Sequence, residues 1–171
     1  MKILVLNGSP HKNGNTTALV DAFKKGAEGA GHEVVVCPVG TMKINGCLGC
    51  EYCHTKGEGA CIQKDDMQNV YPELNSADVV VLASPVHYFG FTGQMESAIS
   101  RFYAGMKPAK ATKYAMILSS ASPNVTAGIE AQYKCMLGLF GAEDAGILAV
   151  NGEDNKSDAA LAKAEALGKN L

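Results

Sequence analysis

Short apolar runs alternate with helix-like segments five times along the chain, and this alternation restricts the fold more than any other feature. The runs have the length of strands and lie at residues 2–6, 32–36, 77–83, 113–118 and 146–150. Run 77–83 is apolar at every position after Asp78, as expected for a strand buried on both faces. Alternating strands and helices form a parallel sheet with right-handed crossovers and helices on both faces. The sequence therefore predicts an α/β fold.

Segments with apolar residues at helical spacing follow the runs. The first expected helix begins at a cap at residue 15 or 16 and ends at 29. Further helices are expected from 65 or 66 to 74, at 93–103 and at 128–139, and the last one follows a cap at Ser157. Residues 40–65 show no period and carry glycines, cysteines and polar residues, so they form a long functional loop. We find no internal repeat and expect one domain, residues 1–171, with a Cys-rich insertion at about 40–65.

The composition excludes several classes of function. The chain has 171 residues, 19% of them charged, a net charge of −2 and no lysine or arginine cluster, so we expect no nucleic-acid partner. The most apolar stretch, 79–83, is too short to span a bilayer. The N-terminus lacks the apolar core and cleavage site of a signal peptide. We expect a cytoplasmic protein without a membrane partner, in which the cysteines do not form a disulfide framework.

Ligands of open parallel sheets bind beyond the carboxyl ends of the strands, where the strand order reverses. This rule selects the loops after Leu6, Ala83 and Leu118. The first loop combines glycines with side-chain donors before a helix N-terminus, which is a favourable arrangement for a phosphate. The residues expected to bind it are Ser9, His11, Asn13, Gly14, Asn15 and Thr16. The competing interpretation is a polar turn with a good helix cap. The loop has neither the GKS/GKT ending of a P-loop nor G-x-G-x-x-G.

The segment GSPHKNGNT resembles the phosphate loop of the NADPH-dependent FMN reductase branch of flavodoxin-like proteins, and the resemblance covers nearly the whole chain. It implies a flavodoxin-like three-layer fold, with a five-stranded parallel sheet in flavodoxin order, and a bound FMN. It also implies a homodimer or tetramer, for which the 40–65 loop is a plausible contact. Because the chain ends soon after its closing helix begins, we expect no C-terminal extension that acts as a nicotinamide lid.

In the family that this chain resembles, the second loop wraps the isoalloxazine ring, with flat apolar contacts and backbone N–H groups. The corresponding residues are Pro85, Val86, His87, Tyr88, Phe89 and Gly90. Family members often have a tyrosine in place of His87. This histidine is a candidate to tune the flavin or donate a proton, or it is a partly exposed loop residue. In the third loop, Ser119 and Ser120 suit close packing along the flavin edge; the alternative is a plain turn.

Cys47, Cys50, Cys53 and Cys61 form the second strong motif. Four thiolates at this spacing suit a [4Fe–4S] cluster, and the motif resembles that of the iron-sulfur flavoprotein branch of the same family. Three alternatives stay open: a zinc site, thiol–disulfide chemistry, or metal-free thiols near the flavin or a subunit contact. We expect Cys37 and Cys135 to be small buried residues.

These features predict an FMN-dependent oxidoreductase in which the flavin does the chemistry and His87 is the one candidate catalytic residue. The expected electron donor is NAD(P)H or reduced ferredoxin, and the acceptor is a small molecule such as a quinone, a flavin or O2. The rival interpretations are a flavodoxin-type electron carrier without its own substrate, and an FMN-binding protein whose cysteines are structural or bind zinc.

Overall fold

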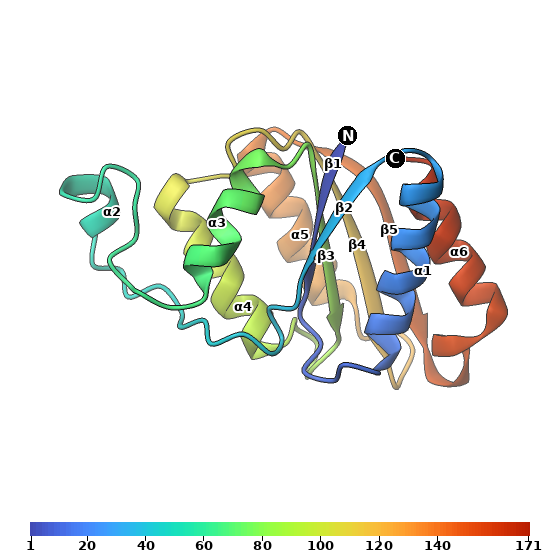
Figure 1. The fold of residues 1–171 in the computed structure, drawn as a ribbon. Coiled ribbons are helices and arrows are strands. Elements are labelled where there is room, and N and C mark those ends of the chain that lie inside the picture. The colour runs from blue at the N-terminus through green and yellow to red at the C-terminus, as the bar shows by residue number, and fades with distance from the viewer.

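Five strands form one parallel sheet in the computed structural model, which describes residues 1–171 (Figure 1). The strands are β1 (Lys2–Asn7), β2 (Glu33–Cys37), β3 (Val79–Pro85), β4 (Lys113–Ser120) and β5 (Glu143–Asn151). Their order is β2-β1-β3-β4-β5, and every neighbouring pair is parallel. This is the flavodoxin order, with its switch point between β1 and β3. The predicted fold class is confirmed.

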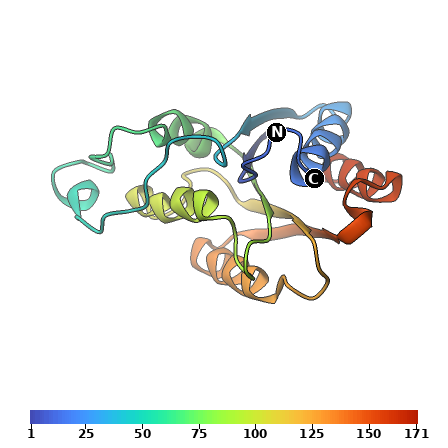
Figure 2. The same cartoon turned by 90° about the horizontal axis from the view of Figure 1, so that it is seen from below.

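Helices cover both faces of the sheet, with α1 and α6 on one side and α3, α4 and α5 on the other (Figures 1 and 2). The helices are α1 (Asn15–Gly29), α2 (Tyr52–Thr55), α3 (Met67–Ser76), α4 (Gly93–Ser100), α5 (Ala127–Phe140) and α6 (Asp158–Lys169). Two 3-10 helices complete the set, η1 (Arg101–Gly105) and η2 (Gly152–Lys156). None of the helices is long and apolar enough to cross a lipid bilayer.

Alternate residues of each central strand point to opposite faces, so the sheet has a hydrophobic core on each side. On β1, Ile3 and Val5 belong to the core under α1 and α6, whereas Leu4 and Leu6 belong to the core under α3, α4 and α5. All four side chains are fully buried. This two-sided burial explains why these runs are continuously apolar rather than alternating.

Two glycines set the distance between α1 and α6. A Cβ built on Gly26 would lie 1.9 Å from the carbonyl oxygen of Glu165, and one built on Gly168 would lie 2.1 Å from that of Phe23. The helices therefore touch backbone to backbone at these two points, which only glycine permits. Ser157 caps α6 as predicted, since its hydroxyl accepts the N–H of Ala160 at 3.1 Å.

Several boundaries differ from the sequence-based expectations. The cap of α1 is Gly14, not Asn15 or Thr16, because the helix already begins at Asn15. Strand β4 continues to Ser120, two residues beyond the predicted end, because it pairs with both β3 and β5. The helix expected at 93–103 ends at Ser100 and continues as η1.

The insertion at 40–65 extends away from the sheet on the α3 and α4 side (Figure 2). It is not entirely irregular, since the four-residue helix α2 forms within it. In both views α2 lies at the opposite side of the molecule from α1.

Candidate functional site

Hydrogen bonds within the loop between β1 and α1 fix its shape. The Ser9 N–H donates to Asn7 Oδ1 (3.0 Å), the His11 N–H donates to Ser9 Oγ (3.2 Å), and the Gly14 N–H donates to the His11 carbonyl (3.1 Å). Ser9 is buried, whereas His11 and Asn13 are exposed. The loop is therefore preorganised from inside, with its outer residues free to meet a ligand.

The N-terminus of α1 faces this loop without a cap. Gly14 offers no side-chain acceptor, no acidic residue lies in the first turn, and the N–H groups of Asn15, Thr16 and Thr17 have no acceptor in the protein. Unpaired N–H groups at a helix N-terminus carry a partial positive charge and attract anions. This geometry favours the phosphate interpretation of the loop over that of a capped turn.

A buried contact joins the first and third loops. The hydroxyl oxygens of Thr16 and Ser119 lie 2.7 Å apart, and both side chains are buried. The Ser120 hydroxyl donates to the Ser122 carbonyl (2.8 Å), and Asn155 donates its Nδ2 to the Ser120 carbonyl (2.8 Å). Both serine hydroxyls thus have partners within the protein, and their first role is to hold the loops together.

The second loop is a tight turn that exposes two aromatic rings. The His87 N–H donates to the Gly90 carbonyl (3.0 Å), and the Gly90 N–H donates to the His87 carbonyl (3.1 Å). The His87 N–H is therefore not free for a ligand, whereas the N–H groups of Tyr88 and Phe89 have no acceptor in the protein. Tyr88 and Phe89 both have positive φ, 50° and 68°, a strained conformation for non-glycine residues. Tyr88 is 97% exposed and Phe89 59% exposed, far from the usual packing of aromatic residues.

The second and third loops border a small open pocket of about 130 Å³. Its lining residues are Val86, Tyr88, Phe89, Ser120, Ala121, Ser122 and Val125. Pro85 ends β3 just before it, and the Val86 N–H donates to the Ser119 carbonyl (2.8 Å). The structure therefore brings all three loops of the sequence prediction together at one edge of the sheet.

Two residues outside the predicted site stabilise this edge. The buried Thr92 caps α4 by accepting the Met95 N–H, and it donates its hydroxyl to the Gly8 carbonyl (2.8 Å), which links the first and second loops. Lys156 of η2 donates its Nζ to the Asn13 carbonyl (3.0 Å) and brings a cation to the loop between β1 and α1. The capping position of Thr92 was recognisable from the sequence, but its bond to Gly8 was not.

The four cysteines of the insertion line one cavity of about 20 Å³, which they share with Arg101 and Tyr103. Cys47 and Cys50 are exposed, whereas Cys53 and Cys61 are half-buried. Desolvation raises the pKa of the Cys53 thiol. No group of three or more His, Cys, Asp or Glu side chains is arranged to hold a metal ion as the structure stands. A larger cavity of about 370 Å³ adjoins the first and also includes Cys61.

The two remaining cysteines behave differently from each other. Cys37 is buried at the end of β2, and burial raises the pKa of its thiol. Cys135 is exposed on α5, so the expectation that it is buried was wrong: its helical position faces solvent rather than the sheet. All six cysteines are free thiols.

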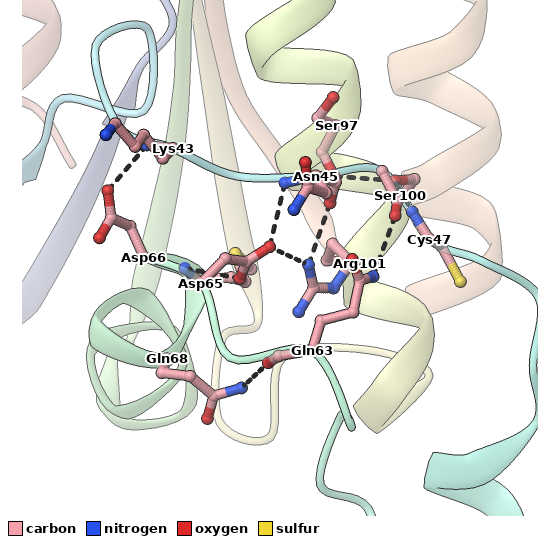
Figure 3. Close-up of polar contacts among 12 residues, drawn as sticks. Lys43, Asn45, Cys47, Gln63, Asp65, Asp66, Gln68, Ser97, Ser100 and Arg101 are labelled. Carbon is pink, nitrogen blue, oxygen red and sulfur yellow. Dashed lines mark hydrogen bonds and ion pairs between the residues drawn. The ribbon is translucent and has the colours of Figure 1, made fainter.

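Two aspartates fasten the insertion to the body of the protein (Figure 3). Asp66 Oδ2 accepts the Lys43 N–H (2.7 Å), and Asp65 Oδ2 accepts both the Asn45 N–H (3.0 Å) and Arg101 Nη1 (2.7 Å). Although burial raises the pKa of Asp65, its hydrogen bonds to Arg101 and Asn45 bring it below the ordinary value. These carboxylates therefore fix both ends of the Cys-rich segment.

The chain is similar in sequence to one protein family and to several curated proteins. The sequence model of a family described as NADPH-dependent FMN reductase matches residues 1–152. An iron-sulfur flavoprotein of Archaeoglobus fulgidus is 41% identical over 115 residues, 67% of this chain and 51% of that protein. One from Methanocaldococcus jannaschii is 42% identical over 101 residues, 59% of this chain and 50% of that protein. The chain thus spans about half the length of these curated relatives.

A solved structure, an NAD(P)H:quinone oxidoreductase from Methanothermobacter marburgensis, superposes with a TM-score of 0.74 at 18% identity. The match covers 100% of this chain and 96% of that one. At this level of identity the similarity establishes the fold alone.

Proposed function

Because the chain belongs to the NADPH-dependent FMN reductase family, we propose that it is an FMN-dependent oxidoreductase. The flavin lies across the three loops at the carboxyl edge of the sheet. The observation that carries this proposal is the uncapped start of α1, whose free N–H groups lie at the switch point between β1 and β3. We regard residues 1–171 as one FMN-binding domain with the Cys-rich insertion at about 40–65.

The first loop holds the phosphate in this proposal. The N–H groups of Asn15, Thr16 and Thr17 donate to its oxygens, and the ammonium group of Lys156 adds positive charge from the far end of the chain. The buried Ser9 hydroxyl also keeps the loop in shape, because it bonds the His11 backbone. The proposed phosphate residues remain Ser9, His11, Asn13, Gly14, Asn15 and Thr16.

The second and third loops hold the ring. Bound FMN supplies the redox chemistry, since its ring accepts a hydride and releases electrons singly or in pairs. The unpaired N–H groups of Tyr88 and Phe89 are the donors for ring oxygens and nitrogens, and their exposed rings supply flat apolar contacts. His87 is exposed, its imidazole bonds nothing in the protein, and it is the candidate proton donor.

We propose NAD(P)H or reduced ferredoxin as the electron donor, and a quinone, a flavin or O2 as the acceptor. The names of the family and of the similar quinone oxidoreductase support a nicotinamide donor. The names of the iron-sulfur flavoproteins support a one-electron carrier.

The insertion binds a [4Fe–4S] cluster in this proposal, through Cys47, Cys50, Cys53 and Cys61. The donor set fits the group, since a cubane cluster takes one thiolate for each iron, and all four thiols line one cavity. In this structure the thiols are not arranged to hold a metal ion, so cluster binding would require them to come closer together. Zinc and metal-free thiols are the alternatives that metal analysis separates.

We also propose a homodimer or tetramer in the cytoplasm. Because α2 lies at the opposite side of the molecule from α1 (Figures 1 and 2), we propose that the insertion of a partner chain, rather than the chain's own, lies near each flavin. Free thiols at all six cysteines suit a reducing compartment.

Anaerobic purification followed by flavin, iron and sulfide analysis tests the proposal. We expect about one FMN per chain and about four irons and four sulfides, with flavin absorption that bleaches on addition of NADPH or reduced ferredoxin. Steady turnover with a quinone distinguishes an enzyme from a carrier that is reduced but does not turn over. A colourless protein that FMN does not reconstitute would contradict the flavin assignment, and flavin with bound zinc would contradict the cluster.

A further inference from the structure

Arg101 is the one arginine among the 171 residues of the chain, and it is 1% exposed. The other 14 basic residues are lysines. Arg101 begins η1, and its side chain lines the cavity that Cys47, Cys50, Cys53 and Cys61 also line. Charged side chains are almost never fully buried unless they are paired. The chain thus places its most strongly basic group in the wall of the cysteine cavity.

Only part of the guanidinium group is paired (Figure 3). Its Nη1 donates to Asp65 Oδ2 at 2.7 Å and to the Asn45 carbonyl at 3.0 Å. Its Nε and Nη2 are buried and have no acceptor. A buried donor without an acceptor costs about 1–3 kcal/mol and is rare in folded proteins. These N–H groups therefore indicate an acceptor that binds later.

The same cavity is lined by the four cysteine sulfurs and by the polar side chains of Glu51, Gln63 and Tyr103. Gln63 donates its Nε2 to the Gly46 carbonyl (3.0 Å) and carries no charge. The nearby carboxylate of Glu51 accepts the hydroxyl of Tyr103 (2.9 Å), and the Tyr71 hydroxyl donates to the backbone carbonyl of Arg101 (3.3 Å). Neither of these groups is bonded to the free guanidinium nitrogens. The thiolates of the cysteines, and the sulfides that they would surround, are the anionic acceptors that remain.

We propose that Arg101 is a positioning and tuning residue for the iron–sulfur cluster, to whose sulfur atoms its Nε and Nη2 donate hydrogen bonds. This inference rests on the cluster of the proposed function. Hydrogen bonds to the sulfurs and a nearby positive charge favour the reduced, more negative cluster, and so raise its reduction potential. Asp65 has the opposite effect, because its carboxylate lies against the same guanidinium group.

A purely structural role is the rival explanation, since Arg101 also links Asn45 to Asp65 across the two ends of the insertion. The two roles predict different signs for the change in the reduction potential of the cluster. If the link is purely structural, removal of Arg101 and removal of Asp65 have the same effect, because each breaks the same link. For a tuning charge, removal of Arg101 lowers the potential of the cluster and removal of Asp65 raises it.

The test is a redox titration of the anaerobically purified, cluster-loaded protein, with the cluster followed by electron paramagnetic resonance and the flavin by absorbance. The variants are Arg101→Gln, Asp65→Asn and the control Lys64→Gln, which removes an exposed positive charge beside Asp65. We expect the cluster potential to fall in the first variant, to rise in the second and to stay unchanged in the control. The flavin potential should not move in any of them.

Shifts of the same sign in both variants, or no shift in a cluster-loaded Arg101→Gln protein, would overturn the inference while leaving the proposed function intact. Flavin without iron in the wild-type protein would remove the cluster, and the inference with it. If Arg101→Gln does not fold, Asp65→Asn decides alone, because a lowered or unchanged potential in that variant contradicts the tuning role.

Discussion

The hydroxyl oxygens of Thr16 and Ser119 lie 2.7 Å apart although 103 residues separate them in the chain. Each is buried, with relative exposures of 1% and 3%. The bond ties the first turn of α1 to the end of β4, and it fixes the position of the proposed phosphate donors relative to the third loop.

Breaking this bond from either side should destabilise the protein. We expect Thr16→Val and Ser119→Ala each to lower the free energy of unfolding by about 1–3 kcal/mol, because each leaves a buried hydroxyl without its partner. The double variant should cost less than the sum, with a coupling of about 0.5–1.5 kcal/mol. Urea denaturation of the four proteins measures the cycle; strictly additive losses would show that the contact contributes nothing.

A negative charge at the start of α1 should separate helix stability from flavin binding. Asn15→Asp should stabilise the flavin-free protein by about 0.3–1 kcal/mol through the helix dipole, yet weaken FMN binding about tenfold or more by repelling the phosphate. Isothermal titration and thermal melts measure the two effects.

The matched control for this substitution is Asn69→Asp, an exposed position in the first turn of α3. It keeps the change in charge and the dipole effect but is not part of the proposed phosphate loop, so FMN affinity should not fall. Riboflavin, which lacks the phosphate, should bind Asn15→Asp as it binds the wild type. Equal losses for FMN and riboflavin would place the phosphate elsewhere.

The strained second turn predicts a similar trade between stability and binding. Tyr88→Gly removes a side chain from a left-handed position with φ 50°, so the flavin-free protein should gain about 1 kcal/mol in stability. Because the exposed ring is also lost, FMN affinity should fall. Chemical denaturation and fluorescence titration give the two values, and unchanged affinity would exclude Tyr88 from the ring site.

The contact between α1 and α6 predicts opposite effects for two glycines of one helix. Gly26→Ala should cost about 1–3 kcal/mol, since its Cβ would meet backbone atoms of Glu165 that cannot move independently. A Cβ added at Gly29 would have no atom within 4 Å. Gly29→Ala should therefore leave the free energy of unfolding unchanged or raise it by up to about 1 kcal/mol. Thermal melts compare them; equal effects would disprove the close approach of the helices.

Asp65 should contribute to the acid sensitivity of the fold. Its pKa in the folded protein lies below the ordinary 3.8, so its contribution is fully present above that pH and is lost as the pH falls through the lower folded value. We therefore expect the stability of the wild type to fall more steeply below pH 3.8 than that of Asp65→Asn. Urea denaturation at a series of pH values measures the slopes, and parallel slopes would contradict the ion pair with Arg101.

Sequence patterns were sufficient for the layer order and for the three loops at the sheet edge. Strands such as 77–83 are apolar throughout because helices cover both of their faces, and that signal is local. The boundaries did not follow from local patterns, since the length of β4 depends on pairing with β3 and β5 rather than on its own residues. The expected burial of Cys135 failed for a similar reason: helical periodicity alone did not assign it to the solvent face.

By itself, the sequence determined the parallel α/β fold, the glycine-rich loop after β1 and the presence of four closely spaced cysteines, because each depends on residues near one another in the chain. Only the tertiary structure decided that Thr16 meets Ser119, that Lys156 reaches Asn13 and that Arg101 lines the cysteine cavity. These contacts join residues from distant segments, and they form only when the folded sheet and its helices bring those segments together.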